Sequence, residues 1–484
     1  MDHPTTSRSA LASEPMTLAD PVWVRRWLED HGVAFLERFV ALNSLSPAFD
    51  PEWERHGTLA AAIDLAAETV EAAGFEGTEI VRQTIPGRSP ALAVRIPGRG
   101  HGTALVYGHL DVQPAVGPWR DGSDPHRVVR HGERLVGRGV VDDGYSVVAV
   151  LAALEGLRAM GADAPTVWAL FETSEESGSP DLDAHLDALA PTIGPVDLVV
   201  CLDAGGLDTK RLWLTSSLRG NLVVVVDIAV LDHGIHSGEA GGVVPETFRI
   251  LRALLERLED PVTGDIRVDA LRSAVPEPVR EAARALVEAL GDPFAGAYPL
   301  LEGVRLEGAD PVERLLRQSW GTAIALTGID GVPSVDTGGN VLRPSLTAKL
   351  SVRIPPDVDA VRALDALVAT LSADPPNGAR VRVTPEAPAQ GWAGAALPDW
   401  LADALARGSI ASFGEPPRSV GVGGSIPFLA SLGERFPGVP IVATGALAPT
   451  SNAHGPDEVL ELPAATGVAV SLAEALGALA QRSF

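Results

Sequence analysis

Histidine and acidic residues stand in the loops that follow the apolar segments of the sequence. They are His109, Asp111, Asp142, Asp143, Glu175, Glu176 and Asp203. Loops at the carboxyl ends of parallel strands converge on one crevice of an open α/β sheet, so these side chains are expected to lie close together. One imidazole and several carboxylates in one crevice would leave unpaired negative charge, which a bound cation neutralises. The combination therefore predicts a metal site.

Each of these signals also has an ordinary structural explanation. Asp142-Asp143 before a helix is equally well explained as an N-cap followed by a carboxylate that the helix dipole favours. Glu175-Glu176 could form an exposed acidic turn, and Asp203 before two glycines is a common turn residue. A histidine at the end of a strand is often a packed or hydrogen-bonded residue. Only the occurrence of all these signals together favours metal binding.

The elements that must position these residues are short apolar strands alternating with helices. Strands are expected at 92–96, 104–110, 166–171 and 198–202, with an Ala-rich helix at 146–160. Further helices are expected at 22–42, 57–73, 400–413 and 464–481, and a further strand at 439–443. This alternation predicts an α/β fold with a mostly parallel sheet.

A different order of elements occupies the middle of the chain. The expected strands are 221–230, 322–327, 346–354 and 380–384, and the expected helices are 246–258 and 358–371. Their order, βαββαβ, is typical of a ferredoxin-like domain. An extra stretch at 260–319 has helical periodicity of its own. We therefore expect a loose tail at 1–20, a catalytic domain made of 21–213 and 394–484, and an inserted domain at 214–393.

The composition narrows the class of protein. The chain has 484 residues, 46% of them hydrophobic, and a formal net charge of −25. These values exclude a disordered chain, and the negative charge argues against nucleic acid or a membrane surface as a partner. We expect no apolar run long enough to span a membrane. The single cysteine, Cys201, cannot form an intramolecular disulfide, so a cytoplasmic enzyme is expected.

The motifs resemble a known family. The order His109-x-Asp111, Asp142, Glu175-Glu176, Asp203 and a late His454 resembles the M20 family of dinuclear zinc peptidases and amidohydrolases. Five stretches look most like its carnosinase-like dipeptidase branch. They are YGHLDVQP at 107–114, GRGVVDD at 137–143, EESGS at 175–179, His236-Ser237-Gly238, and GGSIP at 423–427. The resemblance runs from about Trp23 to the C-terminus, and it includes the inserted domain.

The resemblance implies two Zn²⁺ ions per subunit, for which Mn²⁺ or Co²⁺ could substitute. Asp142 would bridge the ions. His109 and Asp203 would complete the coordination of one ion, and Glu176 and His454 that of the other. Each ion then receives one imidazole, one terminal carboxylate and one shared oxygen, with a position left for water.

The resemblance also implies the catalytic roles. Glu175 would be the general base. The Asp111 carboxylate would not bind metal itself but would fix the tautomer and orientation of the His109 imidazole. His236 would reach the active site of the other subunit of a homodimer and stabilise the oxyanion, although alone it looks like a loop histidine. The inserted domain would then serve as lid and dimerisation domain.

Two residues are implied to bind substrate. Arg353 would bind the terminal carboxylate of the substrate, since a planar bidentate donor suits that group; alone it looks like an exposed strand residue. Ser425 would contact the substrate, and its ordinary explanation is a helix N-cap.

The chain departs from the branch in two places. Gly144-Tyr145 stands where Lys-Gly is usual, and Val422 stands where Glu is usual. We therefore expect an altered pocket. The predicted reaction is hydrolysis of a small peptide-like amide, most readily a dipeptide with a free C-terminal carboxylate. The alternative within the family is an amidohydrolase acting on N-acyl or N-carbamoyl amino acids. A non-enzymatic binding homologue is disfavoured because all five ligands and the base are present.

Overall fold

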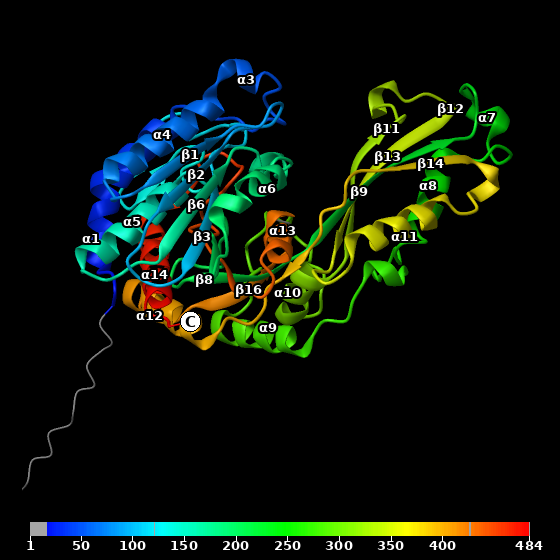
Figure 1. Ribbon diagram of the computed structural model, residues 1–484. Coiled ribbons are helices and arrows are strands. Elements are labelled where there is room, and N and C mark those ends of the chain that lie inside the picture. The colour runs from blue at the N-terminus through cyan, green and yellow to red at the C-terminus, as the bar shows by residue number, and fades with distance from the viewer. Residues whose placement is uncertain (1–16, 121, 425–426, 484) are drawn as a thin grey trace, which may run out of the picture.

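The computed structural model describes residues 17–120, 122–424 and 427–483. Its largest sheet has six strands in the order β1-β2-β6-β3-β7-β17 (Figure 1). The strands are β1 (Glu79–Gln83), β2 (Ala91–Ile96), β3 (Thr103–His109), β6 (Thr166–Glu172), β7 (Leu198–Cys201) and β17 (Ile441–Ala443). Strands β6, β3, β7 and β17 pair in parallel, while β1 and β2 form an antiparallel edge. The predicted α/β fold with a mostly parallel sheet is confirmed.

Helices cover both faces of this sheet. One core joins the sheet to α1 (Pro21–Trp27), α2 (Val33–Val40), α4 (Thr58–Ala73), α5 (Tyr145–Ala159), α12 (Asp399–Phe413) and α14 (Leu462–Ala480). A second core packs α6 (Leu182–Ile193) and α13 (Pro427–Arg435) on the opposite face. Strands buried on both faces explain the continuous apolar runs in the sequence, since an alternating pattern would require one exposed face.

Helix α14 corrects one expectation. Among the described residues, it is the one helix long and apolar enough to cross a membrane, although no such segment was expected. However, 89% of its apolar window is buried inside the protein, where α14 packs against α12 and α5. Burial in the core accounts for its composition.

The second large sheet has four strands in the order β11-β13-β9-β14. The strands are β9 (Gly220–Ala229), β11 (Ala323–Asp330), β13 (Ser345–Ile354) and β14 (Arg380–Pro385), and their neighbours are all antiparallel. Helices α8 (Thr247–Leu255) and α11 (Ala360–Ser372) share one core with this sheet. Alternate residues of β9 and β13 are buried, as a sheet with one covered face requires. The βαββαβ order predicted from the sequence is therefore the observed one.

Two further sheets each have three strands. Strand β8 (Trp213–Leu218) lies between β15 (Trp392–Ala393) and β16 (Arg418–Val422), so the predicted boundaries of 214–393 fall within or next to this sheet. The stretch expected to be helical contains α9 (Glu277–Leu290) and α10 (Pro311–Trp320), which pack on β8 and β16. Strand β18 (Val459–Glu461) pairs with β5 (Arg134–Val136), which in turn pairs with β4 (Val129–His131).

Candidate metal centre

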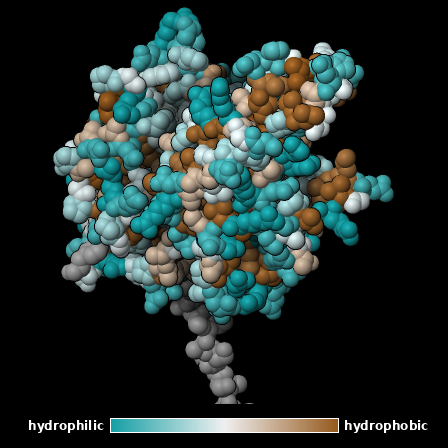
Figure 2. All heavy atoms as spheres, turned by 90° about the vertical axis from the view of Figure 1, so that its right-hand side faces the viewer, coloured by the Kyte–Doolittle hydropathy of each residue, from teal (hydrophilic) through white to brown (hydrophobic). Residues whose placement is uncertain are grey.

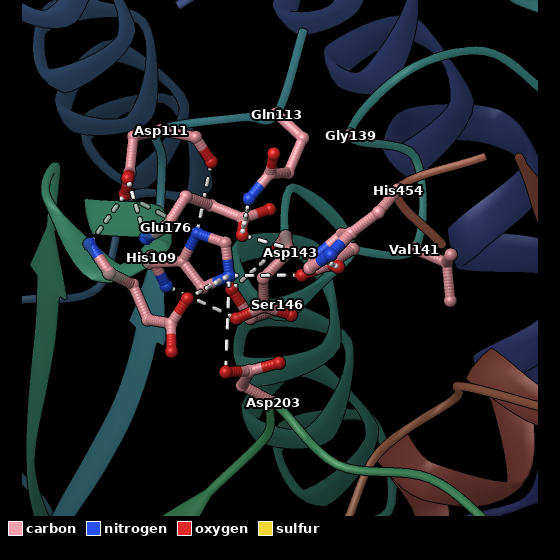
Figure 3. A network of polar contacts seen from close by, with 12 residues as sticks. His109, Asp111, Gln113, Gly139, Val141, Asp143, Ser146, Glu176, Asp203 and His454 are labelled. Atoms are coloured by element: carbon pink, nitrogen blue, oxygen red, sulfur yellow. Dashed lines mark hydrogen bonds and ion pairs between the residues drawn. The ribbon is translucent and has the colours of Figure 1, made fainter. Parts of the chain in front are cut away.

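The centre begins at the end of β3, where the chain leaves the sheet with His109 (Figure 3). The His109 side chain is fully buried, and its backbone N–H donates to Asp143 Oδ2 over 3.1 Å. Its Nδ1 lies 3.0 Å from the backbone oxygen of Asp111, while its Nε2 lies 3.1 Å from Asp142 Oδ1. A hydrogen bond at Nδ1 leaves Nε2 as the nitrogen available to a ligand or cation.

Asp111 fixes the neighbouring acidic turn. Its two carboxylate oxygens accept hydrogen bonds from the backbone N–H groups of Glu175 (3.1 Å) and Glu176 (3.0 Å). That turn follows β6, which pairs in parallel with β3, so two neighbouring strand ends are joined through one buried carboxylate. The hydrogen bond at His109 Nδ1 is thus made with the backbone oxygen of Asp111, while the Asp111 carboxylate, with Oδ1 3.4 Å from Nδ1, holds the acidic turn.

Asp142 lies between the two histidines. Its Oδ1 faces His109, and its Oδ2 lies 3.0 Å from Nε2 of His454. His454 Nε2 also lies 3.1 Å from Glu176 Oε2, and Gln113 Nε2 donates to that same oxygen over 2.9 Å. The Asp142 carboxylate therefore contacts two imidazoles that are far apart in the sequence.

Two groups of potential ligands share Asp142. One group is His109, Asp142 and Asp203, and the other is Asp142, Glu176 and His454; within each, the donor atoms lie within 4.8 Å of one another. Nitrogen and carboxylate donors in sets of three suit zinc with an open position. The Oε1 atom of Glu176 is buried and has no hydrogen-bond partner among the described residues. This donor set fits a pair of divalent cations.

The electrostatics of the centre favour a cation. Burial raises the pKa of Asp203 to about 7, although His109 opposes the shift. Burial, followed by the charge of Asp203, raises the pKa of Glu175 well above its ordinary value. Hydrogen bonds to Asp142 and Glu176 raise the pKa of His454 to about 10. Asp203 and Glu175 resist ionisation and the imidazole of His454 retains a proton, as expected where negative charge is in excess.

Glu175 lies beside both groups of ligands and is part of neither. Its Oε2 is 4.0 Å from His109 Nε2, and its side chain is 14% exposed. A carboxylate in this position faces the centre without occupying a ligand position, which suits a proton acceptor.

A buried ion pair that the sequence analysis missed supports the centre. Arg138 Nη1 donates to Glu458 Oε2 over 2.6 Å, and both side chains are almost completely buried. Glu458 also accepts hydrogen bonds from the backbone N–H groups of Gly139, Val141 and Asp142. Arg138 Nη2 donates to the backbone oxygen of the residue after His454. The pair thereby links the backbone at Asp142 to the backbone next to His454. An arginine inside an apolar loop was the signal that could have revealed it.

Two predicted site residues, His236 and Arg353, are not brought to the centre. His236 lies in β10 (Ile235–His236) at the start of α7 (Ser237–Ala240), where it is exposed and its Nδ1 accepts from the Gly238 N–H. Figure 1 shows α7 at the outer end of the four-stranded sheet, away from the six-stranded one. Arg353 lies in β13, half-buried, with Asn221 as its partner on β9. Ser425 lies outside the described residues.

The two departures from the family motifs occupy apolar surroundings. A Cβ atom on Gly144 would lie 2.5 Å from the ring of Phe39, which is a buried core residue. Position 144 therefore points into the core, and a lysine there would require Phe39 to move. Val422 is half-buried and packs against two apolar clusters.

Comparison with curated proteins finds dipeptidases. The chain is 26% identical over 420 residues to a cysteinylglycine-S-conjugate dipeptidase of Corynebacterium striatum, covering 83% of this chain and 86% of that protein. It is 31% identical over 265 residues to a Cys-Gly metallodipeptidase of Saccharomyces cerevisiae, covering 53% of this chain and 54% of that protein. These matches agree with the carnosinase-like branch expected from the motifs.

Solved structures share the fold. Human carnosine dipeptidase 1 aligns with a TM-score of 0.72 at 21% identity, covering 96% of this chain and 100% of that one. An M20 family metallo-carboxypeptidase from Sulfolobus solfataricus aligns with a TM-score of 0.73 at 20% identity, covering 93% and 99%. Residues 105–478 match peptidase family M20/M25/M40. Because this match spans most of the chain and contains every ligand of the candidate metal centre, the protein belongs to peptidase family M20/M25/M40.

Proposed function

We propose that the protein is a metal-dependent dipeptidase with two divalent cations per chain, zinc being the best fit to the donors. The observation that carries this proposal is the pair of three-residue ligand groups that share Asp142. The dipeptidase names of its curated relatives support the substrate class. A reducing compartment, the cytoplasm, suits a chain whose one cysteine is buried and unpaired.

Glu175 performs the proton transfers in this proposal. Its raised pKa, caused by burial and then by Asp203, suits a base that must also act as an acid. When bound, two zinc ions would polarise the scissile carbonyl and lower the pKa of the attacking water. Glu175 takes the proton from the attacking water and delivers it to the nitrogen of the leaving amine. Asp111 holds the Glu175 turn in place through the backbone.

Arg353 binds the substrate's C-terminal carboxylate in this proposal, and Ser425 contacts the substrate. Burial lowers the pKa of Arg353, and the nearby Arg219 has a pKa lowered to about 10 by burial and by the charge of Arg353. Arg219 also donates to the backbone oxygen of Gly423 over 3.0 Å, so the segment that leads to Ser425 contacts Arg219. Two neighbouring cations half-removed from water favour an anionic ligand.

The catalytic unit in this proposal is a homodimer. Strand β11 is an edge of the four-stranded sheet, and it exposes Leu326 (46%) and Ile329 (40%). Figure 2, which faces this end of the molecule, shows hydrophobic side chains gathered in its upper right part. An apolar edge strand is a template for pairing, and a second copy of the chain would cover it. His236 would then act on the centre of the partner subunit.

A second candidate is hydrolysis of N-acyl or N-carbamoyl amino acids. Val422, half-buried in apolar surroundings, favours it, because a carboxylate at this position could hold a substrate ammonium. Losing that charge-assisted contact would cost a free amine roughly 1.5–3 kcal/mol. N-blocked substrates would lose nothing, so their relative turnover should be high.

The test is hydrolysis of matched free and N-acetyl dipeptides by zinc-reconstituted protein. We expect cleavage of free dipeptides, with Glu175→Gln retaining its metal while kcat falls roughly 10²–10⁴-fold. Val422→Glu should shift kcat/KM towards the free amines. If that ratio does not change, Val422 does not determine specificity. If wild-type protein and Glu175→Gln cleave equally, the assignment of the base is wrong.

A further inference from the structure

Tyr145, the second residue of the Gly144-Tyr145 departure, contacts the residue that precedes Asp203. It begins α5, and its side chain is completely buried. Its hydroxyl donates to the backbone oxygen of Leu202 and accepts from the backbone N–H of Ala446 over 3.0 Å. Both hydrogen-bonding capacities of this phenol are thus used on backbone groups from two different strand ends.

Tyr145 enters where the regular pairing of those two strand ends stops. Strands β7 and β17 pair as far as Cys201 and Ala443, and the Thr444 N–H still donates to Cys201 O over 2.9 Å. An isolated bridge follows further along, where Leu447 pairs with Gly205. Between these points the Tyr145 hydroxyl joins Leu202 to Ala446, so a side chain supplies hydrogen bonds where the regular strand pairing has ended.

This arrangement fixes the peptide that precedes Asp203. The Leu202 N–H donates to Tyr107 O of β3 over 3.0 Å, and Leu202 O accepts from Tyr145. Burial raises the pKa of Tyr145 well above its ordinary value, so the phenol remains a donor at neutral pH. On the other side, a Cβ on Gly445 would lie 2.4 Å from Leu202 O, which shows how closely the two segments approach. Little freedom remains for the backbone at Asp203.

We propose that Tyr145 is a positioning residue that holds Asp203 as the terminal ligand of one metal position. The inference rests on the proposed two-cation centre. Asp203 belongs to the group with His109 and not to the group with His454. Tyr145 therefore acts on one metal position and leaves the other intact, whereas Gln113, which donates to Glu176, acts on the other.

The experiment is zinc titration of the metal-free full-length protein against a competing chelator, which resolves the two binding steps. Tyr145→Phe removes only the hydroxyl, and we expect one step to weaken by up to about 10–100-fold, the range found when a group bonded directly to a metal ligand is removed. Gln113→Leu should weaken the other step. The double variant should weaken both, which shows that different positions are affected.

Thr444→Val is the matched control. Thr444 lies in the same segment as Ala446, but its hydroxyl donates to the backbone oxygen of Trp213 in β8 and not to Leu202. We expect this variant to keep both steps unchanged even if its unfolding temperature falls. The inference is overturned if Tyr145→Phe changes neither step or both equally, or if Thr444→Val reproduces its effect. Wild-type protein that binds no zinc would instead overturn the metal centre itself, and the inference with it.

Discussion

Asp142 is the residue on which both halves of the proposed metal centre depend. Its two oxygens face His109 and His454, whereas Asp203 belongs to one group alone. Asp142→Ala should therefore lose both zinc ions on dialysis, while Asp203→Ala should lose one. Metal analysis by mass spectrometry checks this difference. Two tightly held ions in Asp142→Ala would remove Asp142 from the bridging position.

The candidate ligands could be predicted from their residue types, but the residues that hold them in place could not. Histidine and carboxylates at strand ends have a chemical meaning that can be inferred from the sequence alone. Glu458 and Tyr145 act through backbone groups that are distant in sequence, so nothing next to them reveals their role. His454 was inferred only from the family pattern, because its loop has no distinguishing local signal.

The pairing of β5 with β18 brings the loop that carries Asp142 together with the loop that carries His454. Arg138 follows β5 and Glu458 precedes β18, and their ion pair is buried. Arg138→Met would leave a buried carboxylate uncompensated, at a cost of about 3–5 kcal/mol in the free energy of unfolding. Urea unfolding of the metal-free protein measures this change.

The same pair of strands offers an exposed comparison. Arg134 of β5 contacts Glu461 of β18 over 2.8 Å, with the arginine side chain 53% exposed. Arg134→Met should cost less than about 1 kcal/mol, because exposed ion pairs contribute little. Equal losses in the two variants would show that burial of the Arg138 pair is not what stabilises the loops.

Long apolar strands were predictable, and short or irregular elements were not. The expected segments 92–96 and 166–171 nearly coincide with β2 and β6, because a strand buried on both faces has a continuous apolar run. The single helix expected at 22–42 is instead interrupted by a π-helical turn at Leu28–Gly32. Three-residue strands such as β5 and β18 contain too few residues to establish a period, so only their pairing defines them.

The buried carboxyl groups make the stability of the whole protein depend on pH and on bound metal. Burial raises the pKa values of Asp203 and Glu458 to about 7. A carboxyl group with a higher pKa in the folded chain than in the unfolded one stabilises the fold at low pH. That contribution disappears as the pH rises through about 7. His454, with its pKa raised to about 10, changes stability in the same direction above its ordinary value.

The metal-free protein should therefore lose stability between pH 5 and pH 8, and zinc should restore it, since ligands bind zinc in their deprotonated forms. Thermal unfolding with chelator and with zinc, measured across this range, checks the prediction. A metal-free unfolding temperature that rises over the same interval would contradict it.

The proposed dimer makes a separate prediction about two inactive variants. Glu175→Gln and His236→Ala subunits, mixed and allowed to exchange, should regain activity, because a mixed dimer would hold one centre with both groups intact. Mass spectrometry of the intact dimers confirms exchange. Exchange without recovered activity would exclude action of His236 across the subunits.

The late position of His454 bears on how the protein acquires metal during its synthesis. A chain still on the ribosome presents His109, Asp142 and Asp203 long before the loop at 452–458 is made. However, Ala446 completes the hydrogen bonds of Tyr145, and Glu458 holds the backbone of Asp142. Neither ligand group is therefore fixed until the C-terminal segment has folded back onto the sheet. In the proposed two-cation centre, metal capture would consequently be an event of the finished chain, and a nascent or C-terminally clipped chain would not retain the metal.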